Sequence, residues 1–242
     1  MKKTFSTIAV AAAMTFAVGG AHAMGINSTL SATYYEVADF SDPDFNVNTV
    51  PVVADGGALG PDGLPVATGG VHDIGPSSQL TWWSPAFNAN VVQTGTGVIT
   101  LPFNSNMYAP GGTGTNDGSF FQTAKFAGVF ALDGSGTVTF TLGSDDDSFL
   151  YVDNILIGQN PGVHGVSTVV FTSPTLAAGS HAINLFYADR QQTGAYLSLD
   201  SSASITAPSC SPPRKTYSPA FSREAAPVNS AMVTNAHRQR MT

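Results

Sequence analysis

The sequence predicts an all-β protein, an antiparallel β-sandwich with long surface loops, and three observations support this prediction. Between residues 30 and 200, short runs rich in β-branched and aromatic residues are separated by Gly, Asn, Asp and Pro, which is the pattern of strands and turns. In Thr137–Leu142 polar and apolar residues alternate strictly, as in a strand with one buried face. No segment between residues 24 and 206 sustains a helical apolar period with capping residues.

The expected strands follow one another closely along the chain. Short strands at this spacing are typical of a sandwich or barrel. We expect tight turns between antiparallel neighbours at Gly134–Gly136 and Ala178–Ser180. The clearest runs are Ala32–Val37, Val98–Leu101, Lys125–Leu132, Thr137–Leu142, Ser148–Ile157, Ser167–Phe171, His181–Tyr187 and Ala195–Leu199.

Composition divides the chain into four parts. Residues 1–23 are an expected signal peptide, 24–117 a β-rich N-terminal part, 118–206 a second β-rich part, and 207–242 a tail. We expect the two β-rich parts to form one domain. Within the first of them, residues 51–76 alternate Gly, Pro and Asp with isolated apolar residues, which predicts a long surface loop.

The N-terminus has the features of an export signal. Met1-Lys2-Lys3 is positively charged, an apolar stretch runs from Ile8 to Val18, and Ala21-His22-Ala23 has the small-x-small pattern of a cleavage site. The alternative is an uncleaved anchor, but the apolar stretch is shorter than the roughly 20 residues that span a bilayer. We therefore expect a mature chain that is secreted, extracellular or at the cell surface, without stable membrane insertion.

Charge is distributed unevenly along the chain. Between residues 24 and 206 the fixed positive charges are Lys125 and Arg190, against one Glu and fourteen Asp. This balance argues against nucleic acid, which Lys and Arg recognise by neutralising phosphates, and against an anionic membrane surface. Basic residues and the only cysteine, Cys210, lie in Ser209–Thr242. That segment is rich in Ser, Pro, Ala and Asn and shows no period, so we expect disorder.

An acidic cluster carries the strongest chemical signal. Asp145, Asp146 and Asp147 directly precede the apolar run Ser148–Val152, which ends at Asp153-Asn154. Three successive carboxylates repel one another unless a cation or turn amides compensate them. Ca²⁺ takes six to eight oxygen ligands, which loop carboxylates and carbonyls supply. The residues therefore predict either a calcium site or an acidic turn in which Asp side chains accept backbone hydrogen bonds.

The segment around this cluster resembles a known family. Ser144–Asn154 is similar to the S-D-D-x-x-x-L-Y-V-D-G signature of PA14 domains and, more closely, to the related fibro-slime domain. Gly162-Val163-His164 resembles the G-G-x-H element of the fibro-slime domain, and Phe186–Arg190 its F-Y-A-E-R element. Phe120–Gly128 is similar to the aromatic strand that leads into PA14 domains. The resemblance covers roughly residues 118–202.

The resemblance implies a β-sandwich of the PA14-like, jelly-roll type with a calcium site at a loop rim. In sugar-binding PA14 members an Asp-Asp pair, joined by a cis peptide, holds Ca²⁺ that grips sugar hydroxyls. The spacing to Asp153 assigns this pair to Asp145-Asp146, and Asp147 then stands where many relatives have Gly. The chain also departs from the family pattern at Pro161, Asn154 and Asp189, where relatives have Gly, Gly and Glu.

Several other residues have two interpretations. His164 either lines the site or makes a structural hydrogen bond, and Trp83 of Trp82-Trp83 either stacks on sugar rings or packs in the core. Asn160 follows the strand in the loop where sugar-binding PA14 members place a ligand-gripping Asn. We expect Arg190 to pair with an aspartate, and Asp189 to be either a further ligand or a neighbour of Arg190.

The sequence argues against an enzyme. Glycoside hydrolysis needs two carboxylates that flank a cleft, whereas the acidic residues here are almost all Asp in turn-like settings. No G-x-S-x-G, H-E-x-x-H or Cys-His arrangement is present. The histidines His72, His164 and His181 lack the spacing of zinc ligands.

The sequence therefore predicts an exported, non-enzymatic protein that binds carbohydrate with the help of calcium, or adheres to surfaces. Its expected partner is a polysaccharide or a cell-surface glycan. The alternative is a structural matrix or coat protein, or a cell-surface protein-interaction module, that binds no glycan.

Overall fold

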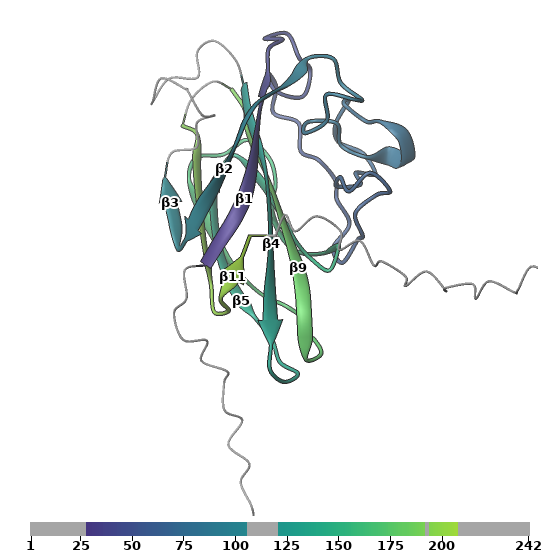
Figure 1. Cartoon of the computed structure of the whole chain (residues 1–242). Coiled ribbons are helices and arrows are strands. Elements are labelled where there is room, and N and C mark those ends of the chain that lie inside the picture. Colours follow the sequence, from purple (N-terminus) through teal and green to yellow (C-terminus); the bar gives the residue numbers. More distant parts are fainter. Residues whose placement is uncertain (1–27, 106–120, 192–193, 208–242) are drawn as a thin grey trace, which may run out of the picture. The chain divides into compact units, whose positions relative to one another are not determined.

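The computed structural model describes residues 28–105, 121–191 and 194–207 (Figure 1). The predicted signal peptide, residues 1–23, and the predicted tail from residue 208 onward lie outside the described residues. In the described part of the chain the regular structure is β apart from one 3-10 turn, η1 (Pro76–Ser78). No helix in these ranges has the length and apolar character of a membrane span.

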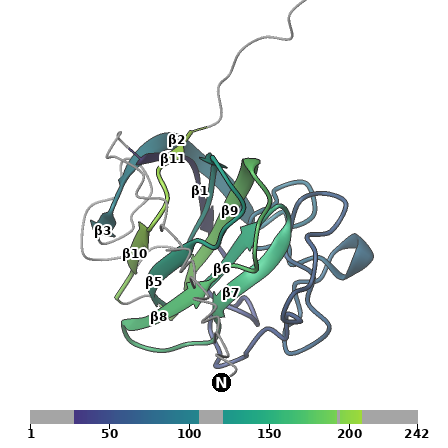
Figure 2. The same cartoon turned by 90° about the horizontal axis from the view of Figure 1, so that it is seen from below.

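The described strands form two antiparallel sheets that pack face to face (Figure 2), so the prediction of an all-β sandwich is confirmed. The larger sheet has the order β2-β1-β4-β9-β6-β7, with β11 paired to β4, and the smaller has the order β3-β10-β5-β8. The strands are β1 (Ser28–Val37), β2 (Val91–Leu101), β3 (Phe103–Ser105), β4 (Phe121–Leu132), β5 (Thr139–Asp145), β6 (Asp147–Val152), β7 (Ile155–Asn160), β8 (Ser167–Thr172), β9 (Gly179–Asp189), β10 (Tyr196–Ser201) and β11 (Ile205–Thr206).

The connections at Gly134–Gly136 and Ala178–Ser180 differ from the expected turns between paired neighbours. β4 lies in the larger sheet and β5 in the smaller one, and β8 and β9 are separated in the same way. Each connection therefore crosses between the sheets, so that β4 pairs with β9 and β5 with β8. The two crossings meet at an isolated bridge between Gly136 and Leu176.

Alternation along the strands divides the apolar residues between two clusters. In β9, Leu185 and Tyr187 belong to the core between the sheets, whereas Phe186 and Ala188 belong to a second cluster on the outer face of the larger sheet. Successive strand residues point to opposite faces, so both faces of β9 are covered. β6 is buried at all six positions for the same reason.

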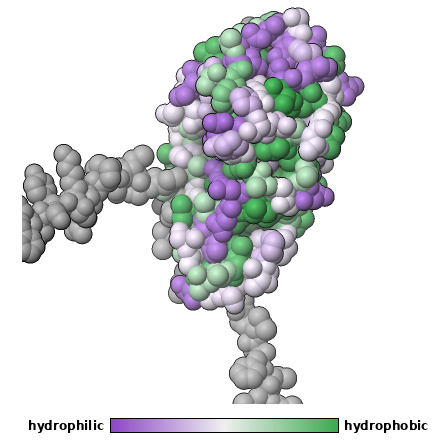
Figure 3. All heavy atoms as spheres, turned by 90° about the vertical axis from the view of Figure 1, so that its right-hand side faces the viewer, coloured by the Kyte–Doolittle hydropathy of each residue, from purple (hydrophilic) through white to green (hydrophobic). Residues whose placement is uncertain are grey.

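The cover on the outer face is a lobe formed by residues 38–90, the chain between β1 and β2 (Figures 1 and 2). Residues 51–76, predicted as a surface loop, contribute Val53, Leu64 and Ala67 to the second cluster. Burial of a Val or Leu side chain is worth about 1.5–3 kcal/mol, so this loop also stabilises the fold. On its outer side, apolar and polar side chains are interspersed (Figure 3).

Candidate cation-binding site

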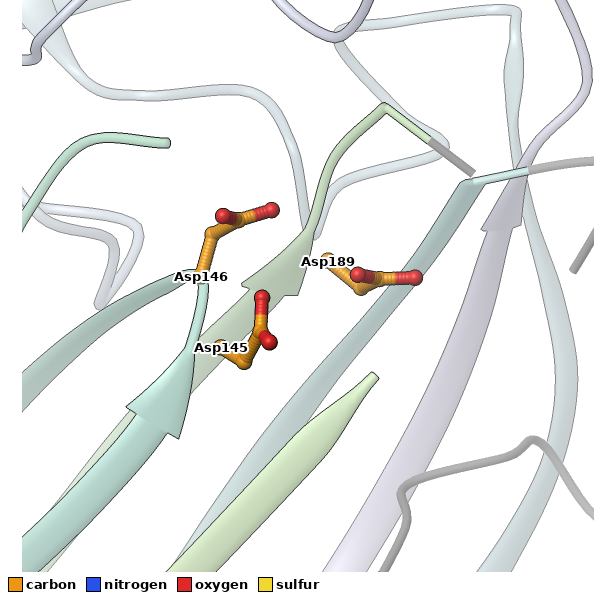
Figure 4. Close-up of side chains that lie close together, drawn as sticks. All are labelled: Asp145, Asp146 and Asp189. Atoms are coloured by element: carbon orange, nitrogen blue, oxygen red, sulfur yellow. The ribbon is translucent and has the colours of Figure 1, made fainter. Parts of the chain in front are cut away.

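Three aspartates meet at one end of the sandwich. β5 ends at Asp145 and β6 begins at Asp147, so Asp146 lies at the junction of the two strands. The Asp145-Asp146 peptide bond is cis, as the resemblance implies. Asp189 is the last residue of β9, and its carboxyl group lies beside those of Asp145 and Asp146 (Figure 4).

The three carboxylates are close enough to share one cation. One oxygen from each of Asp145, Asp146 and Asp189 lies within 4.8 Å of the others. Calcium binds oxygen at 2.3–2.6 Å, so two ligands on opposite sides of the ion are about 4.8 Å apart. The group offers only oxygen, which suits a hard cation rather than zinc or copper.

Backbone amides from two loops orient the Asp-Asp pair. His164 N donates to Asp146 Oδ1 at 2.7 Å, and Arg190 N donates to Asp146 Oδ2 at 2.8 Å. The backbone amide of Val166 acts to lower the pKa of Asp145. The element that resembles G-G-x-H therefore holds the acidic pair through its backbone, whichever role the His164 ring has.

Asp145 is also held from the strand side, by a residue that sequence reasoning did not single out. Tyr187 Oη donates to the Asp145 carbonyl at 2.6 Å and accepts from Tyr196 N at 3.0 Å. The neighbouring loop approaches at Gly194, where a Cβ would lie 2.8 Å from Asp145 Oδ2 and φ is +91°. The alternation in Phe186–Arg190 was the available signal for Tyr187, because it places Tyr187 and Asp189 on one face.

The site concentrates negative charge. Burial, followed by the charge of Asp146, raises the pKa of Asp145 to about 6. Burial also raises the pKa of Asp146, against the lowering effect of its backbone hydrogen bonds and of the Arg190 charge. Burial is thus the main cause of both shifts, and a bound cation would favour the ionised form of both carboxyl groups.

Asp147 lies on the opposite face of the sheet, and the prediction that it is a third metal ligand needs correction. Its Oδ2 forms an ion pair with Arg190 Nε at 2.7 Å, and both side chains are fully buried. Gly162 N donates to its Oδ1. The physical reason is alternation: Asp146 faces the core between the sheets, so Asp147 faces the lobe. The expected pairing of Arg190 with an aspartate is confirmed.

Arg190 also joins the lobe to the sheet. Its Nη1 donates to the Asp44 carbonyl at 2.8 Å and to Thr49 Oγ1 at 2.9 Å, and its Nη2 donates to the Thr49 carbonyl at 2.8 Å. The guanidinium lies over the Trp82 ring, 5.4 Å from its centre. One buried side chain thus connects the end of β9, β6 and the loop around Thr49.

The predicted sugar-contacting residues have different positions. Trp83 is 2% exposed and donates from Nε1 to the Tyr187 carbonyl at 2.8 Å, so it packs in the core and cannot stack on a sugar. Asn160 donates from Nδ2 to Ser144 Oγ at 3.0 Å, and His164 is partly exposed at the rim. Ligand contacts by Asn160 and by His164 stay predictions.

Comparison with known proteins identifies the domain that carries these carboxylates. Residues 104–212 match the family model described as the PA14 domain. The segment that carries the site is therefore similar to PA14 domains. The match includes Asp145, Asp146 and Asp189, whereas β1, β2 and the lobe precede it, although β1 and β2 are strands of the same sheet as β4.

Solved structures similar to the chain include two PA14 domains. A PA14 sugar-binding domain from an RTX adhesin has 16% identity and a TM-score of 0.39, over 73% of this chain and 90% of that chain. The PA14 domain of the antifreeze protein MpAFP has 14% identity and a TM-score of 0.36, over 76% and 95%.

A third similar structure is an enzyme. The β-glucosidase from Kluyveromyces marxianus in complex with glucose has 11% identity and a TM-score of 0.35, over 71% of this chain and 16% of that chain. No curated protein sequence matches the chain.

Proposed function

We propose that this protein is an exported, non-enzymatic adhesion module that binds carbohydrate through a calcium ion held by its PA14 domain. The observation that carries the proposal is the convergence of three carboxylates, from Asp145, Asp146 and Asp189, within 4.8 Å. The PA14 match supports it, because the resemblance in this segment implies a calcium site that contacts sugar hydroxyls.

The donor set fits calcium in type and in placement. Asp145 and Asp146 come from the β5–β6 junction and Asp189 from the end of β9, so three points of the sheet rim would hold the ion. Calcium takes six to eight oxygens, which leaves coordination positions for oxygens from outside the protein. When bound, the ion supplies positive charge and open positions that vicinal sugar hydroxyls can occupy. The half-exposed Asp145 and His164 mark the side open to solvent.

The same geometry argues against glycoside hydrolysis at this site. Hydrolysing pairs of carboxyl groups flank the scissile bond about 5–5.5 Å apart in retaining enzymes and about 6.5–9.5 Å apart in inverting enzymes. Oxygens of Asp145, Asp146 and Asp189 instead converge within 4.8 Å. Oxygens that converge in this way suit a shared cation.

Thermal melts of the full chain, in 10 mM CaCl₂ and in excess chelator, test the calcium part of the proposal. Extracellular calcium modules have Kd values of about 10⁻⁴–10⁻³ M. Selective binding to the folded state then adds about 1.4–2.7 kcal/mol, or a rise of about 3–10 °C in Tm. An unchanged Tm at saturating calcium would contradict the site.

A glycan array with and without chelator tests the carbohydrate part. The proposal predicts binding to at least one glycan class that disappears when calcium is removed. Calcium stabilisation without binding to any glycan would favour the structural alternative, a matrix or coat protein with a structural calcium site. Light scattering against calcium concentration would then show whether the ion drives self-association.

A further inference from the structure

Gln122 lies in the row of residues that crosses the larger sheet at the cation site. Its pairing partner on β9 is Asp189. On the other side of β9, Asp147 pairs with Ala188, so continuing that register by one residue places Asp146 opposite Asp189. Gln122, Asp189 and Asp146 therefore occupy one row on three adjacent segments of chain.

The side chains of this row point to the same face. Ala124 and Phe126, two and four residues beyond Gln122, lie in the core between the sheets. Leu185 and Tyr187, which precede Asp189 at the same spacing, lie in that core too. Because strand side chains alternate, Gln122 and Asp189 both point between the sheets. Directly opposed Cβ atoms are about 4.5–5.5 Å apart, within reach of the long Gln side chain.

Gln122 has a buried oxygen without a partner. The residue is 3% exposed, and no described residue donates a hydrogen bond to its Oε1. Buried carbonyl oxygens normally accept a hydrogen bond. The neighbouring carboxylates cannot supply one when ionised, because an ionised carboxylate only accepts. A cation bound by the neighbouring carboxylates would also give this oxygen a partner.

We propose that Gln122 Oε1 is a fourth protein oxygen ligand of the calcium ion held by Asp145, Asp146 and Asp189. This inference rests on the proposed function. Calcium sites in proteins combine carboxylates with Asn or Gln side-chain carbonyls. A neutral carbonyl raises the number of ligands without adding to the negative charge of three carboxylates. It also ties β4 to a site that otherwise depends on β9 and the β5–β6 junction.

The neighbour of Gln122 on its other side is a second acidic residue. Glu36 of β1 is the pairing partner of Gln122, and it alternates with Ala32, which lies in the core between the sheets. The Gln122 amide is thus flanked by Glu36 on one side and by Asp189 on the other.

Calcium titration by calorimetry, with matched thermal melts, tests the role of Gln122 in the full chain. Gln122→Met keeps the length of the side chain and removes the oxygen, so it should weaken calcium affinity at least tenfold. Gln122→Glu retains an oxygen ligand, so it should bind calcium at least as tightly as the wild type. Its extra carboxylate should lower the Tm in chelator and enlarge the calcium-induced rise. Gln93→Met, at an exposed residue of β2, is the control and should leave both quantities unchanged.

The possible results separate this inference from the proposed function. A wild-type affinity in Gln122→Met would overturn the ligand role while the calcium site itself stands. Loss of calcium binding in both Gln122 variants would also overturn it, because the amide N–H would then be the essential group. If Gln122→Met fails to fold, the result for Gln122→Glu decides alone. A wild-type chain that binds no calcium would overturn the site and the inference together.

Discussion

Asp146 and Asp147 are adjacent in the chain, yet the fold places them in different environments on opposite faces of one sheet. Asp147 points into the lobe, where Arg190 neutralises it at 2.7 Å. Asp146 points between the sheets towards Asp145 and Asp189, where the protein supplies backbone amides but no side-chain ion pair among the described residues. Asp189 and Arg190 are also adjacent in the chain, and their side chains likewise point to opposite faces of the sheet.

A third group of carboxylates, in the lobe, shows another solution. Asp44 is buried and accepts from His72 N, Asp73 N and Trp82 Nε1. Burial, followed by the charges of Asp42 and Asp44, raises the pKa of Asp73 to about 7. In the lobe a retained proton limits the charge, and at Asp147 an arginine balances it. At the rim, oxygens of Asp145, Asp146 and Asp189 converge within 4.8 Å, which is why we assign the external cation to that site.

The largest effect should come from breaking the internal ion pair. Arg190→Met leaves Asp147 buried without a counter-charge, which typically costs about 3–5 kcal/mol. It also removes the bonds from Arg190 to Asp44 and Thr49. Urea denaturation should show this loss in the free energy of unfolding, in chelator and in calcium alike.

Two variants control for the loss of a cation as such. Lys125→Met removes the other fixed positive charge in the described residues, 28–105, 121–191 and 194–207. Lys125 forms no ion pair among these residues, so its loss should lower the free energy of unfolding far less. Asp147→Asn combined with Arg190→Met should recover part of the lost stability. A free energy of unfolding within about 1 kcal/mol of the wild type in Arg190→Met would refute the view that this pair stabilises the junction.

A smaller effect should come from the proton-bearing carboxyl group in the lobe. The pKa of Asp73 rises from 3.8 to about 7 on folding. Between these pH values the folded state keeps a proton that the unfolded chain has lost, so this group lowers stability as pH rises. Asp73→Asn keeps an N–H donor for Asp42 and does not titrate.

Melting temperatures at pH 5 and pH 8, both in chelator, check this prediction. Asp73→Asn should melt a few degrees above the wild type at pH 8, and the difference should shrink at pH 5. Identical pH dependence in the two proteins would contradict a raised pKa at Asp73.

Local patterns were sufficient to predict much of this architecture. Strict alternation in Thr137–Leu142 and the apolar run after the acidic cluster predicted real strands, β5 and β6. The pairing of those strands could not be predicted, because alternation shows which face a residue takes and not which strand lies beside it. The burial of residues 51–76 was harder to predict, because their isolated apolar residues are buried only against a sheet that the local sequence does not show.

The candidate site was predicted in part for the same reason. The resemblance pointed to Asp145 and Asp146, but residue type alone suggested that Asp147 would join them. The strand register instead brings Asp189 to the site as the third carboxylate. Asp189 lies 42 residues beyond Asp147 in the chain, and in the sheet it follows Ala188, the pairing partner of Asp147. Trp83 was misjudged because the lobe that buries it could not be foreseen.

The most direct test of the account makes one substitution at two positions, Asp145→Asn and Asp147→Asn, and measures Tm with and without calcium. Asp145→Asn should melt close to the wild type in chelator and lose most of the calcium-induced rise. Asp147→Asn should melt well below the wild type in both buffers, because Arg190 stays buried without its counter-charge, and should keep the calcium-induced rise. If Asp147→Asn abolished the rise and Asp145→Asn preserved it, the division between the two faces would be wrong.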